Sequence, residues 1–207
     1  MNAIHLLSVV RGSGFSRAGD AAVSIERLDD LAAELARIFQ VSCHVHEESF
    51  SADFAYDQPR NQFHSTAILQ RLENLASDSQ VQVLGVTGLD LFIPILTFVF
   101  GEAQLGGRCA LVSLHRLREE FYGLPPNDDL LWSRLVKESV HELGHTLGLR
   151  HCRDWQCAMA STHDVERLDL KGEEYCQFCL AATSLARPAP RGRESLASAK
   201  LPPRNPA

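Results

Sequence analysis

Apolar residues along the first part of the chain fall into short β-branched or alternating stretches and into helical repeats. These patterns predict strands at residues 3–10, 41–46 and 81–87 and helices at residues 25–38 and 65–76. Ser24 is a favourable N-cap for the first helix, and Gly12, Ser13 and Gly14 are expected to end the first strand. The order strand, helix, strand, helix, strand favours an α/β sheet with right-handed crossovers.

The segment from residue 91 to residue 121 predicts elements of a different character. Pro94 excludes a central paired strand at its own position, because proline cannot donate to the ladder. Residues 97–100 are therefore expected to form a short strand at an edge, and residues 108–114 a further strand. The charged residues 115–121 are expected to form a helical turn.

A long helix is predicted after the break at Pro125 and Pro126, with Asp128 or Asp129 as its cap. Its apolar face is predicted to bury Leu131, Leu135, Val136 and Val140, and its other face to expose Arg134, Lys137 and Glu138. Near the end of the chain, the apolar residues 180–185 are expected to close the fold.

Length and composition predict one globular domain followed by a tail. The chain has 207 residues, 45 % of them hydrophobic, which is enough for one domain with a sizeable core. We place this domain at residues 1–186. Residues 187–207 are rich in Pro, Arg, Ser and Ala, bury little, and are predicted to be disordered.

Charge and hydropathy limit the partners and the compartment. A formal net charge of −6 argues against wholesale nucleic-acid binding. No basic region precedes the N-terminal apolar run, as a signal peptide would require, and the apolar tract at residues 89–100 is too short to span a membrane. We therefore expect a soluble, cytoplasmic monomer without a membrane partner. In a reducing compartment, its six cysteines favour metal binding or free thiols over disulfides.

The end of the long helix carries the pattern H-E-x-x-H-x-x-G-x-x-H from His141 to His151. On a helix, His141 and His145 lie on one face one turn apart, which suits two ligands of one zinc ion. Gly148 allows the helix to end, so that His151 can return as a third ligand. Three histidines leave a fourth position for water and substrate, which is typical of a catalytic zinc site, and Glu142 is placed as the general base.

Four cysteines follow the third histidine in a C-x4-C and a C-x2-C pair: Cys152, Cys157, Cys176 and Cys179. This arrangement favours a closed structural zinc site over disulfide pairing. Two complete ligand sets with no shared residue predict two zinc ions per chain, one catalytic and one structural. Cys43 and Cys109 fall outside both sets and are predicted to be buried free thiols.

The extended histidine motif, followed by Met159, resembles the metzincin zinc peptidases, and the four cysteines make residues 140–179 resemble the archaemetzincin family. The resemblance implies a compact single-domain α/β fold with a twisted mixed sheet, a zinc-binding active-site helix and a four-cysteine zinc subsite. It also implies that Met159 is the Met-turn residue beneath the catalytic zinc. An edge strand at residues 91–101, or its neighbour, is expected to pair with extended substrate, unless that segment is only a packed apolar strand.

Together these features predict a zinc-dependent metallopeptidase in which Glu142 activates a zinc-bound water to hydrolyse peptide or protein substrates. One alternative is a zinc-organised peptide-binding module without turnover, against which the presence of Glu142 weighs. The other is a non-peptidase zinc amidohydrolase. The candidates for an additional oxyanion donor are Tyr122, Tyr175 and His163.

His44 and His46 alternate along the second predicted strand and could indicate a pair of metal ligands. No third ligand accompanies them in the sequence, so we interpret them as one polar face of that strand.

Overall fold

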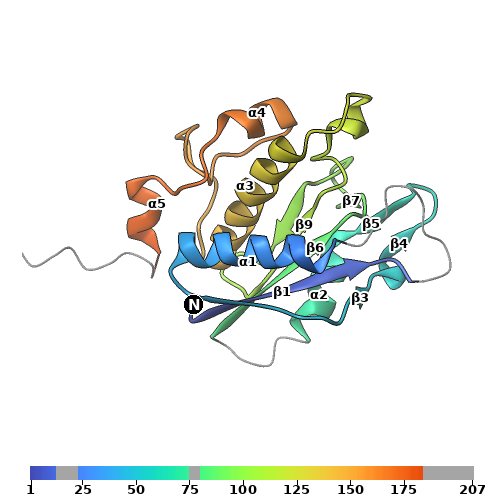
Figure 1. Ribbon diagram of the computed structural model, residues 1–207, viewed down its shortest axis with the longest axis horizontal. Coiled ribbons are helices and arrows are strands. Elements are labelled where there is room, and N and C mark those ends of the chain that lie inside the picture. Colours follow the sequence, from blue (N-terminus) through green and yellow to red (C-terminus); the bar gives the residue numbers. More distant parts are fainter. Residues whose placement is uncertain (13–22, 75–79, 184–207) are drawn as a thin grey trace, which may run out of the picture.

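A six-stranded mixed sheet forms the centre of the protein (Figure 1). The computed structural model describes residues 1–12, 23–74 and 80–183. The strands of this sheet are β1 (Ala3–Val10), β2 (Ser42–Val45), β3 (Phe50–Ser51), β6 (Val81–Thr87), β8 (Gly101–Ala103) and β9 (Cys109–Ser113). Their order is β2-β1-β6-β9-β8, with β3 also paired to β1, and only β8 runs antiparallel to its neighbour.

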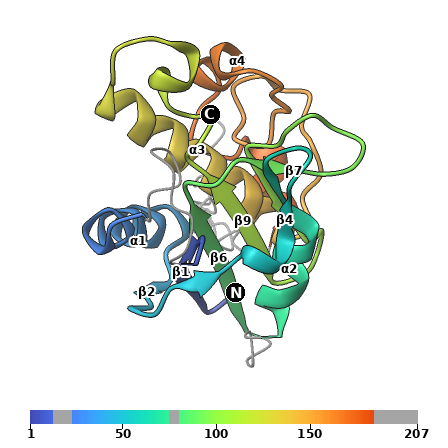
Figure 2. The same cartoon turned by 90° about the vertical axis from the view of Figure 1, so that its right-hand side faces the viewer.

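Helices cover both faces of this sheet. The described α-helices are α1 (Ile25–Phe39), α2 (Ser65–Glu73), α3 (Asp128–Thr146), α4 (Val165–Leu170) and α5 (Gln177–Ala182), and the first three pack on the sheet. Figure 2 shows α1 and α3 on one side of the sheet and α2 on the other. Because successive strand residues point to opposite faces, Leu84 and Val86 pack into the core with α1 and α3, whereas Val83 and Leu111 pack into the core with α2.

The predicted first half of the fold is confirmed in outline. The predicted strands and helices correspond to β1, α1, β2, α2 and β6, and the Oγ of Ser24 accepts the backbone N–H of Arg27 at 3.2 Å as an N-cap. The turn expected at Ser13 and Gly14 and the predicted end of the second helix at Ala76 lie outside the described residues.

A second, three-stranded sheet was not predicted. It consists of β4 (Tyr56–Asp57), β5 (Gln62–His64) and β7 (Leu91–Phe92), in that order, and the short helix η1 (Asp53–Ala55) precedes it. Its strands have only two or three residues, which is too short for an alternating pattern to stand out in the sequence.

The predicted edge strand exists but lies further along the chain. The expected strand at residues 97–100 is wrong, because Val99 donates instead to the carbonyl of Leu91 at 3.0 Å. Pairing with β9 begins at Phe100, whose carbonyl accepts the N–H of Ser113 at 2.8 Å. The edge strand is therefore β8, the neighbour of the predicted segment.

The long predicted helix is α3, which follows the short helix η2 (Glu119–Tyr122). The expected cap at Asp128 or Asp129 is wrong. The cap is Asn127, whose side chain accepts the N–H of Leu130 at 3.0 Å, and the two aspartates lie in the first helical turn. The predicted apolar face is confirmed, since Leu131, Leu135, Val136 and Val140 are buried.

The prediction that Arg134, Lys137 and Glu138 of α3 face solvent is wrong. Arg134, Lys137 and Glu138 are only 2 %, 8 % and 3 % exposed, because the chain after α3 returns across this face. Arg134 pairs with the Asp169 carboxylate at 2.7 Å, and the Nζ of Lys137 donates to the Asp169 carbonyl at 2.9 Å. Glu138 pairs with Lys171.

The end of the described chain does not close the fold as expected. Helix α5 has no buried residue, and Phe178 and Leu180 are exposed. Residues 184 and 185, the predicted domain end at residue 186 and the predicted tail at residues 187–207 lie outside the described residues.

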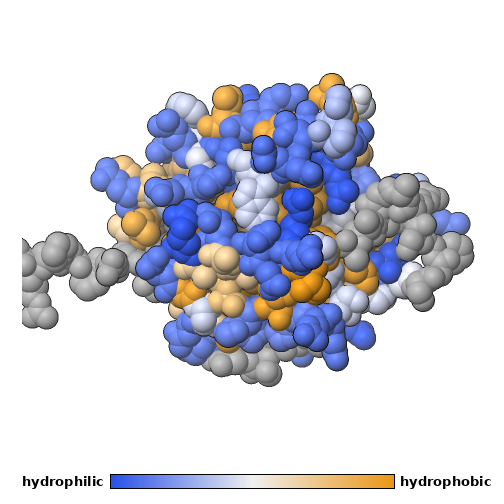
Figure 3. All heavy atoms as spheres, in the orientation of Figure 1, coloured by the Kyte–Doolittle hydropathy of each residue, from blue (hydrophilic) through white to orange (hydrophobic). Residues whose placement is uncertain are grey.

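Hydrophilic residues cover most of the face that Figure 3 presents, with small apolar patches between them. Among the described residues, no helix is both long enough and apolar enough to cross a membrane.

Candidate metal centre and active site

The structure brings the three predicted histidines together at the end of α3. One ring nitrogen from each of His141, His145 and His151 lies within 4.8 Å of the other two. The Nε2 atoms of His141 and His145 are 3.2 Å apart. The last two turns of α3 supply these two residues, and Gly148, at φ 87°, turns the chain so that it can return with His151.

Backbone carbonyls fix the tautomers of two of these histidines. The Nδ1 of His141 lies 2.8 Å from the carbonyl oxygen of Ala158, and the Nδ1 of His145 lies 2.8 Å from that of Leu149. Because a carbonyl can only accept, each Nδ1 carries the proton and each Nε2 keeps its lone pair. Metal-binding histidines are commonly oriented in this way.

Electrostatics keep these imidazoles neutral. Burial lowers the pKa of His141 to about 4, and burial also lowers the pKa of His145 and of His151. At neutral pH the three rings therefore offer lone pairs rather than positive charges. This donor set fits a zinc ion, for which neutral imidazole is a preferred ligand.

Glu142 lies in the same site, and its carboxyl is buried. Burial raises the pKa of Glu142 well above its usual value, and the charge of the neighbouring Glu138 raises it further. A Cβ atom added at Gly101 of β8 would lie 2.7 Å from the Cγ of Glu142 and 2.8 Å from its Oε1. The edge strand therefore passes directly against the Glu142 side chain, and it can do so because residue 101 is glycine.

These groups open into a cleft of about 560 Å³ between α3 and the edge strand. The α3 wall consists of Glu138, His141, Glu142 and His145. The opposite wall includes Leu96, Phe98, Val99, Phe100, Gly101, Glu102, Ala103 and Leu105. A concave site with one apolar wall and a few convergent polar groups is typical of a substrate-binding cleft.

The edge strand presents free backbone groups to this cleft. The N–H of Gln104 donates to the carbonyl of Cys109 at 3.0 Å, and the carbonyl of Phe100 accepts from β9, so the even-numbered residues are the ones bonded to β9. In an antiparallel ladder, the backbone groups of Gly101 and Ala103 then point away from β9. Since β8 ends the strand order, these groups are available to an extended peptide.

The four predicted cysteines converge beside the histidines. Sulfur atoms of Cys152, Cys157, Cys176 and Cys179 all lie within 4.8 Å of one another. All four are free cysteines, and the 3.8 Å between the sulfurs of Cys152 and Cys176 is too long for a disulfide. The backbone N–H groups of Met159 and Cys176 donate to the sulfur of Cys157 at 3.4 and 3.3 Å.

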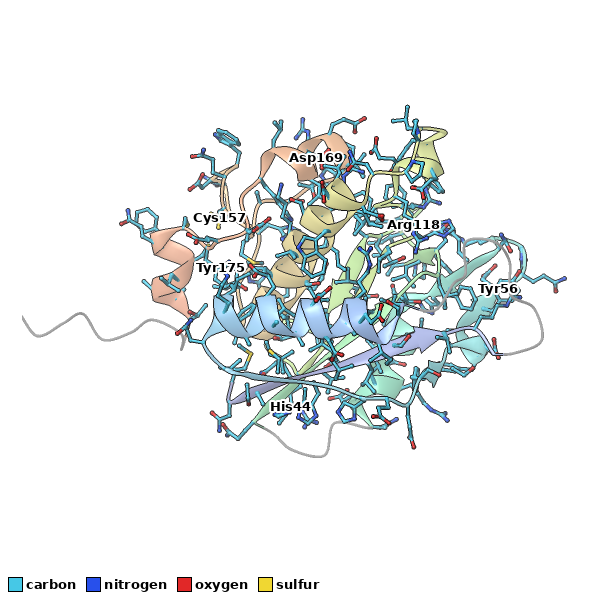
Figure 4. The ribbon with its side chains drawn as sticks, in the orientation of Figure 1. His44, Tyr56, Arg118, Cys157, Asp169 and Tyr175 are labelled. Atoms are coloured by element: carbon cyan, nitrogen blue, oxygen red, sulfur yellow. The ribbon has the colours of Figure 1, made fainter. Side chains whose placement is uncertain are left out.

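Four converging sulfurs fit a structural zinc site. Burial raises the pKa of Cys157, so a thiolate at this position needs a neighbouring cation at neutral pH. Figure 4 shows Cys157 and Tyr175 on the same side of α3, toward the C-terminal end of the fold.

Met159 is fully buried and its sulfur lies against Gly144, the residue before His145. A Cβ added at Gly144 would meet this sulfur and would also lie 2.9 Å from the hydroxyl oxygen of Tyr175. Gly144 thus lets the chain after the histidine loop pack closely beneath α3.

The sequence model of Peptidase family M54 matches residues 41–184 of the chain. The chain belongs to this family. The archaemetzincin of Methanocaldococcus jannaschii is 50 % identical over 127 residues, which are 61 % of this chain and 69 % of that protein. The archaemetzincin of Pyrococcus furiosus is 43 % identical over 142 residues, which are 67 % of this chain and 74 % of that protein.

Solved structures of the same family share the fold. The structure of archaemetzincin from Archaeoglobus fulgidus, complexed with malonate, is 32 % identical, with a TM-score of 0.71 over 87 % of this chain and 99 % of that one. A zinc-dependent peptidase from Methanocorpusculum labreanum is 28 % identical, with a TM-score of 0.74 over 86 % of this chain and 98 % of that one. The predicted family, the predicted α/β fold class and the prediction of a zinc metallopeptidase are confirmed.

Within this archaemetzincin-like site, two of the three candidate oxyanion donors, Tyr122 and Tyr175, lie outside the cleft lining. The hydroxyl of Tyr175 donates to the carbonyl of Val140 at 2.8 Å on the inner side of α3. The hydroxyl of Tyr122 donates to the carbonyl of Arg116 at 2.9 Å, and Tyr122 does not line the cleft. His163 does line the cleft and remains a candidate.

The topology gives His44 and His46 a third histidine as a neighbour. His5 of β1 lies opposite His44, and its Nδ1 is 3.0 Å from the Nε2 of His46. Three histidines are therefore neighbours here, which the sequence spacing does not show, but their ligand atoms do not converge on one point. Among the described residues, three or more potential ligand atoms converge within 4.8 Å only in the three-histidine group at the end of α3 and in the four-cysteine group. Figure 4 shows His44 at the lower edge of the molecule, below α1, and Cys157 above α1.

The remaining cysteines are free thiols as predicted, but only Cys109 is fully buried as predicted. Cys109 is buried and Cys43 is half-buried, and both are free. Burial raises the pKa of each thiol to about 11.

The sequence analysis missed two parts of the site. Gly101 has no motif around it, and its role follows only from the approach of β8 to Glu142. Glu138 was assigned to solvent although it lines the cleft. Its position one turn before His141 and Glu142 was a signal that could have placed it on their face.

We expect Gly101→Ala to keep the zinc and to lower kcat/KM for peptide hydrolysis by about 10²-fold, because the added carbon would displace the Glu142 side chain, or would move the edge strand through its 2.7 Å approach to the carbonyl oxygen of Leu111. Steady-state kinetics and elemental analysis would measure the two effects. Gly85→Ala is the matched control, since it adds the same carbon to β6 against flexible side-chain ends only. Wild-type kcat/KM in Gly101→Ala would show that β8 yields without affecting the site.

Proposed function

We propose that the chain hydrolyses peptide bonds with one zinc ion held by His141, His145 and His151, and with Glu142 as the general base. One observation carries this proposal. The base and the three imidazole nitrogens share one wall of a cleft whose other wall is an edge strand with outward-pointing backbone groups.

When bound, zinc supplies Lewis-acid polarisation of the scissile carbonyl and makes a water molecule more acidic. The outward-pointing N–H and C=O groups of Gly101 and Ala103 hold the substrate backbone as an added strand. The Glu142 carboxylate takes a proton from the attacking water as its oxygen bonds to the carbonyl carbon. It then gives this proton to the amine nitrogen as the carbon–nitrogen bond breaks.

The environment of Glu142 supports this role. Burial and Glu138 raise its pKa, and a carboxylate whose conjugate acid has a higher pKa is a stronger base than an exposed one. The base is also close to the substrate-binding strand, because only glycine at residue 101 leaves it enough room.

We further propose that Cys152, Cys157, Cys176 and Cys179 hold a second, structural zinc ion. Elemental analysis of protein purified without added metal should then give about two zinc ions per chain. The three histidines would bind one ion and the four cysteines the other. The four cluster cysteines should resist alkylation in the native protein until a chelator removes the metal. A zinc content near one, together with rapid alkylation of all four thiols, would reject the second site.

Cleavage of a diverse peptide library, analysed by mass spectrometry, tests the activity itself. We expect cleavage at defined positions that stops when zinc is chelated and returns when zinc is restored. Peptides that bind without being cleaved would identify a zinc-organised binding module. Turnover of other amides in the absence of peptide cleavage would identify a different amidohydrolase.

A further inference from the structure

Glu138 and Lys171 form a buried ion pair next to the candidate active site. The Nζ of Lys171 lies 2.9 Å from the Oε1 of Glu138, and the two side chains are only 1 % and 4 % exposed. Removing two charges from water is costly, and replacing a buried ion pair by apolar residues is often neutral or stabilising. Stability alone therefore does not account for this pair.

The position of Glu138 relates the pair to the histidines. Glu138 precedes His141 by three residues and Glu142 by four, so the three side chains occupy one face of α3. Glu138 also lines the cleft together with His141 and His145. A fixed negative charge in this wall favours a divalent cation at the three neutral imidazoles.

The position of Lys171 relates the pair to the four cysteines. Lys171 begins the segment that leads to Cys176, and the N–H of the next residue, Gly172, donates to the carbonyl of Gln156 at 2.9 Å. Further along this segment, the hydroxyl of Tyr175 donates to the carbonyl of Val140 at 2.8 Å. The ion pair is thus one of the attachments between α3 and the segment that carries the second pair of cysteines.

We propose that Glu138 and Lys171 are positioning residues of the three-histidine site: the Glu138 carboxylate strengthens zinc binding by the imidazoles, and Lys171 holds that carboxylate in place. The inference rests on the proposed function only in taking zinc as the metal of this site. It assigns the pair no contact with substrate.

Three variants separate positioning from stability. Glu138→Gln keeps the shape of the side chain and its bond from Lys171 but removes the charge, and it should lower zinc affinity at the three-histidine site by about 10–100-fold. Lys171→Met leaves the carboxylate buried without a partner and should destabilise the fold. The double variant Glu138→Met with Lys171→Met should recover the stability but keep the low zinc affinity.

A second ion pair of α3, in which Arg134 is buried and Asp169 is 30 % exposed, provides the control. Arg134 pairs with Asp169 at 2.7 Å, and neither residue lines the cleft. Asp169→Asn removes one charge from this pair as Glu138→Gln does from the other. It should lower stability without changing the zinc affinity of the histidine site.

Competition with a chromophoric chelator measures zinc affinity, and urea unfolding measures stability. Cobalt substitution reports the cysteine site separately, through its thiolate charge-transfer absorption. Recovery of both stability and zinc affinity in the double variant would show that the pair is only structural and would overturn the proposal. If the double variant does not fold, wild-type zinc affinity in folded Glu138→Gln would overturn it equally. Zinc affinity is measured without substrate, so a protein that fails to cleave peptides leaves this test intact.

Discussion

Replacing Glu142 by glutamine is expected to leave both zinc sites filled and to lower kcat for peptide hydrolysis by about 10²–10⁴-fold. Glutamine has nearly the same shape as glutamate, so it can occupy the space beside Gly101 without moving the edge strand. It cannot accept the proton of the attacking water, which is the step assigned to this carboxylate. Glu142 belongs to neither group of converging ligand atoms, so the histidine and cysteine ligands stay intact.

The kinetic parameters distinguish loss of the base from loss of binding. The substrate backbone is proposed to be held by β8, so KM should change little while kcat falls. Steady-state kinetics on a cleaved library peptide, with the zinc content of both proteins measured, would test this. Glu120→Gln is a suitable control, because Glu120 is an exposed acid outside the cleft lining. A kcat for Glu142→Gln equal to that of the wild type would remove Glu142 from the mechanism.

The outline of this site was predictable from sequence because its determinants are local. Residues four apart on a helix share a face, so His141 and His145 could be placed together without knowledge of the fold. Gly148 marked the end of the helix, and the return of His151 followed from the short distance along the chain. The β-branched and apolar residues of β1, β6 and β9 likewise identified these strands, and β6 and β9 are almost completely buried.

The parts that could not be predicted depend on contacts between distant segments. An amphipathic pattern assigns Glu138 to solvent, but the chain that covers it arrives more than thirty residues later with Lys171. The same reasoning applies to Tyr175, a plausible donor by residue type that donates instead to the carbonyl of Val140. His5 approaches His46 only because β1 and β2 are parallel neighbours, and sequence spacing does not reveal this.

A second large effect is expected when the cysteine site is removed with the double variant Cys176→Ser and Cys179→Ser. Zinc affinity at the three-histidine site should fall by about 10–100-fold, although neither residue belongs to that site, because supporting groups of a metal ligand have effects of this size. The reason is that His151 and Cys152 are adjacent, so one peptide unit joins a proposed ligand of each zinc ion. Consecutive Cα atoms are only about 3.8 Å apart.

Few other bonds hold this loop: it has a turn of its own at Asp154, and the N–H of Gly172 donates to the carbonyl of Gln156 at 2.9 Å. Residues 153–156 are exposed, as is His151 itself. Cys152 is attached through its N–H to the carbonyl of Met159 at 2.8 Å, and Met159 in turn donates to the sulfur of Cys157. Loss of the cysteine site should therefore loosen the third histidine and the buried Met159 together.

Competitive zinc titration of the double variant against the wild type tests this coupling, restricted to protein that circular dichroism shows to be folded. Cys43→Ser is the control, since Cys43 is a half-buried thiol outside the cluster and should leave both zinc sites unchanged. The alternative is that packing and the N–H bonds from Cys152 to Met159 and from Met159 to Cys157 fix the loop without help from the metal. If the folded double variant binds zinc at the three histidines as tightly as the wild type does, packing and these N–H bonds fix the loop. The four-cysteine site would then stabilise only the segment that carries it.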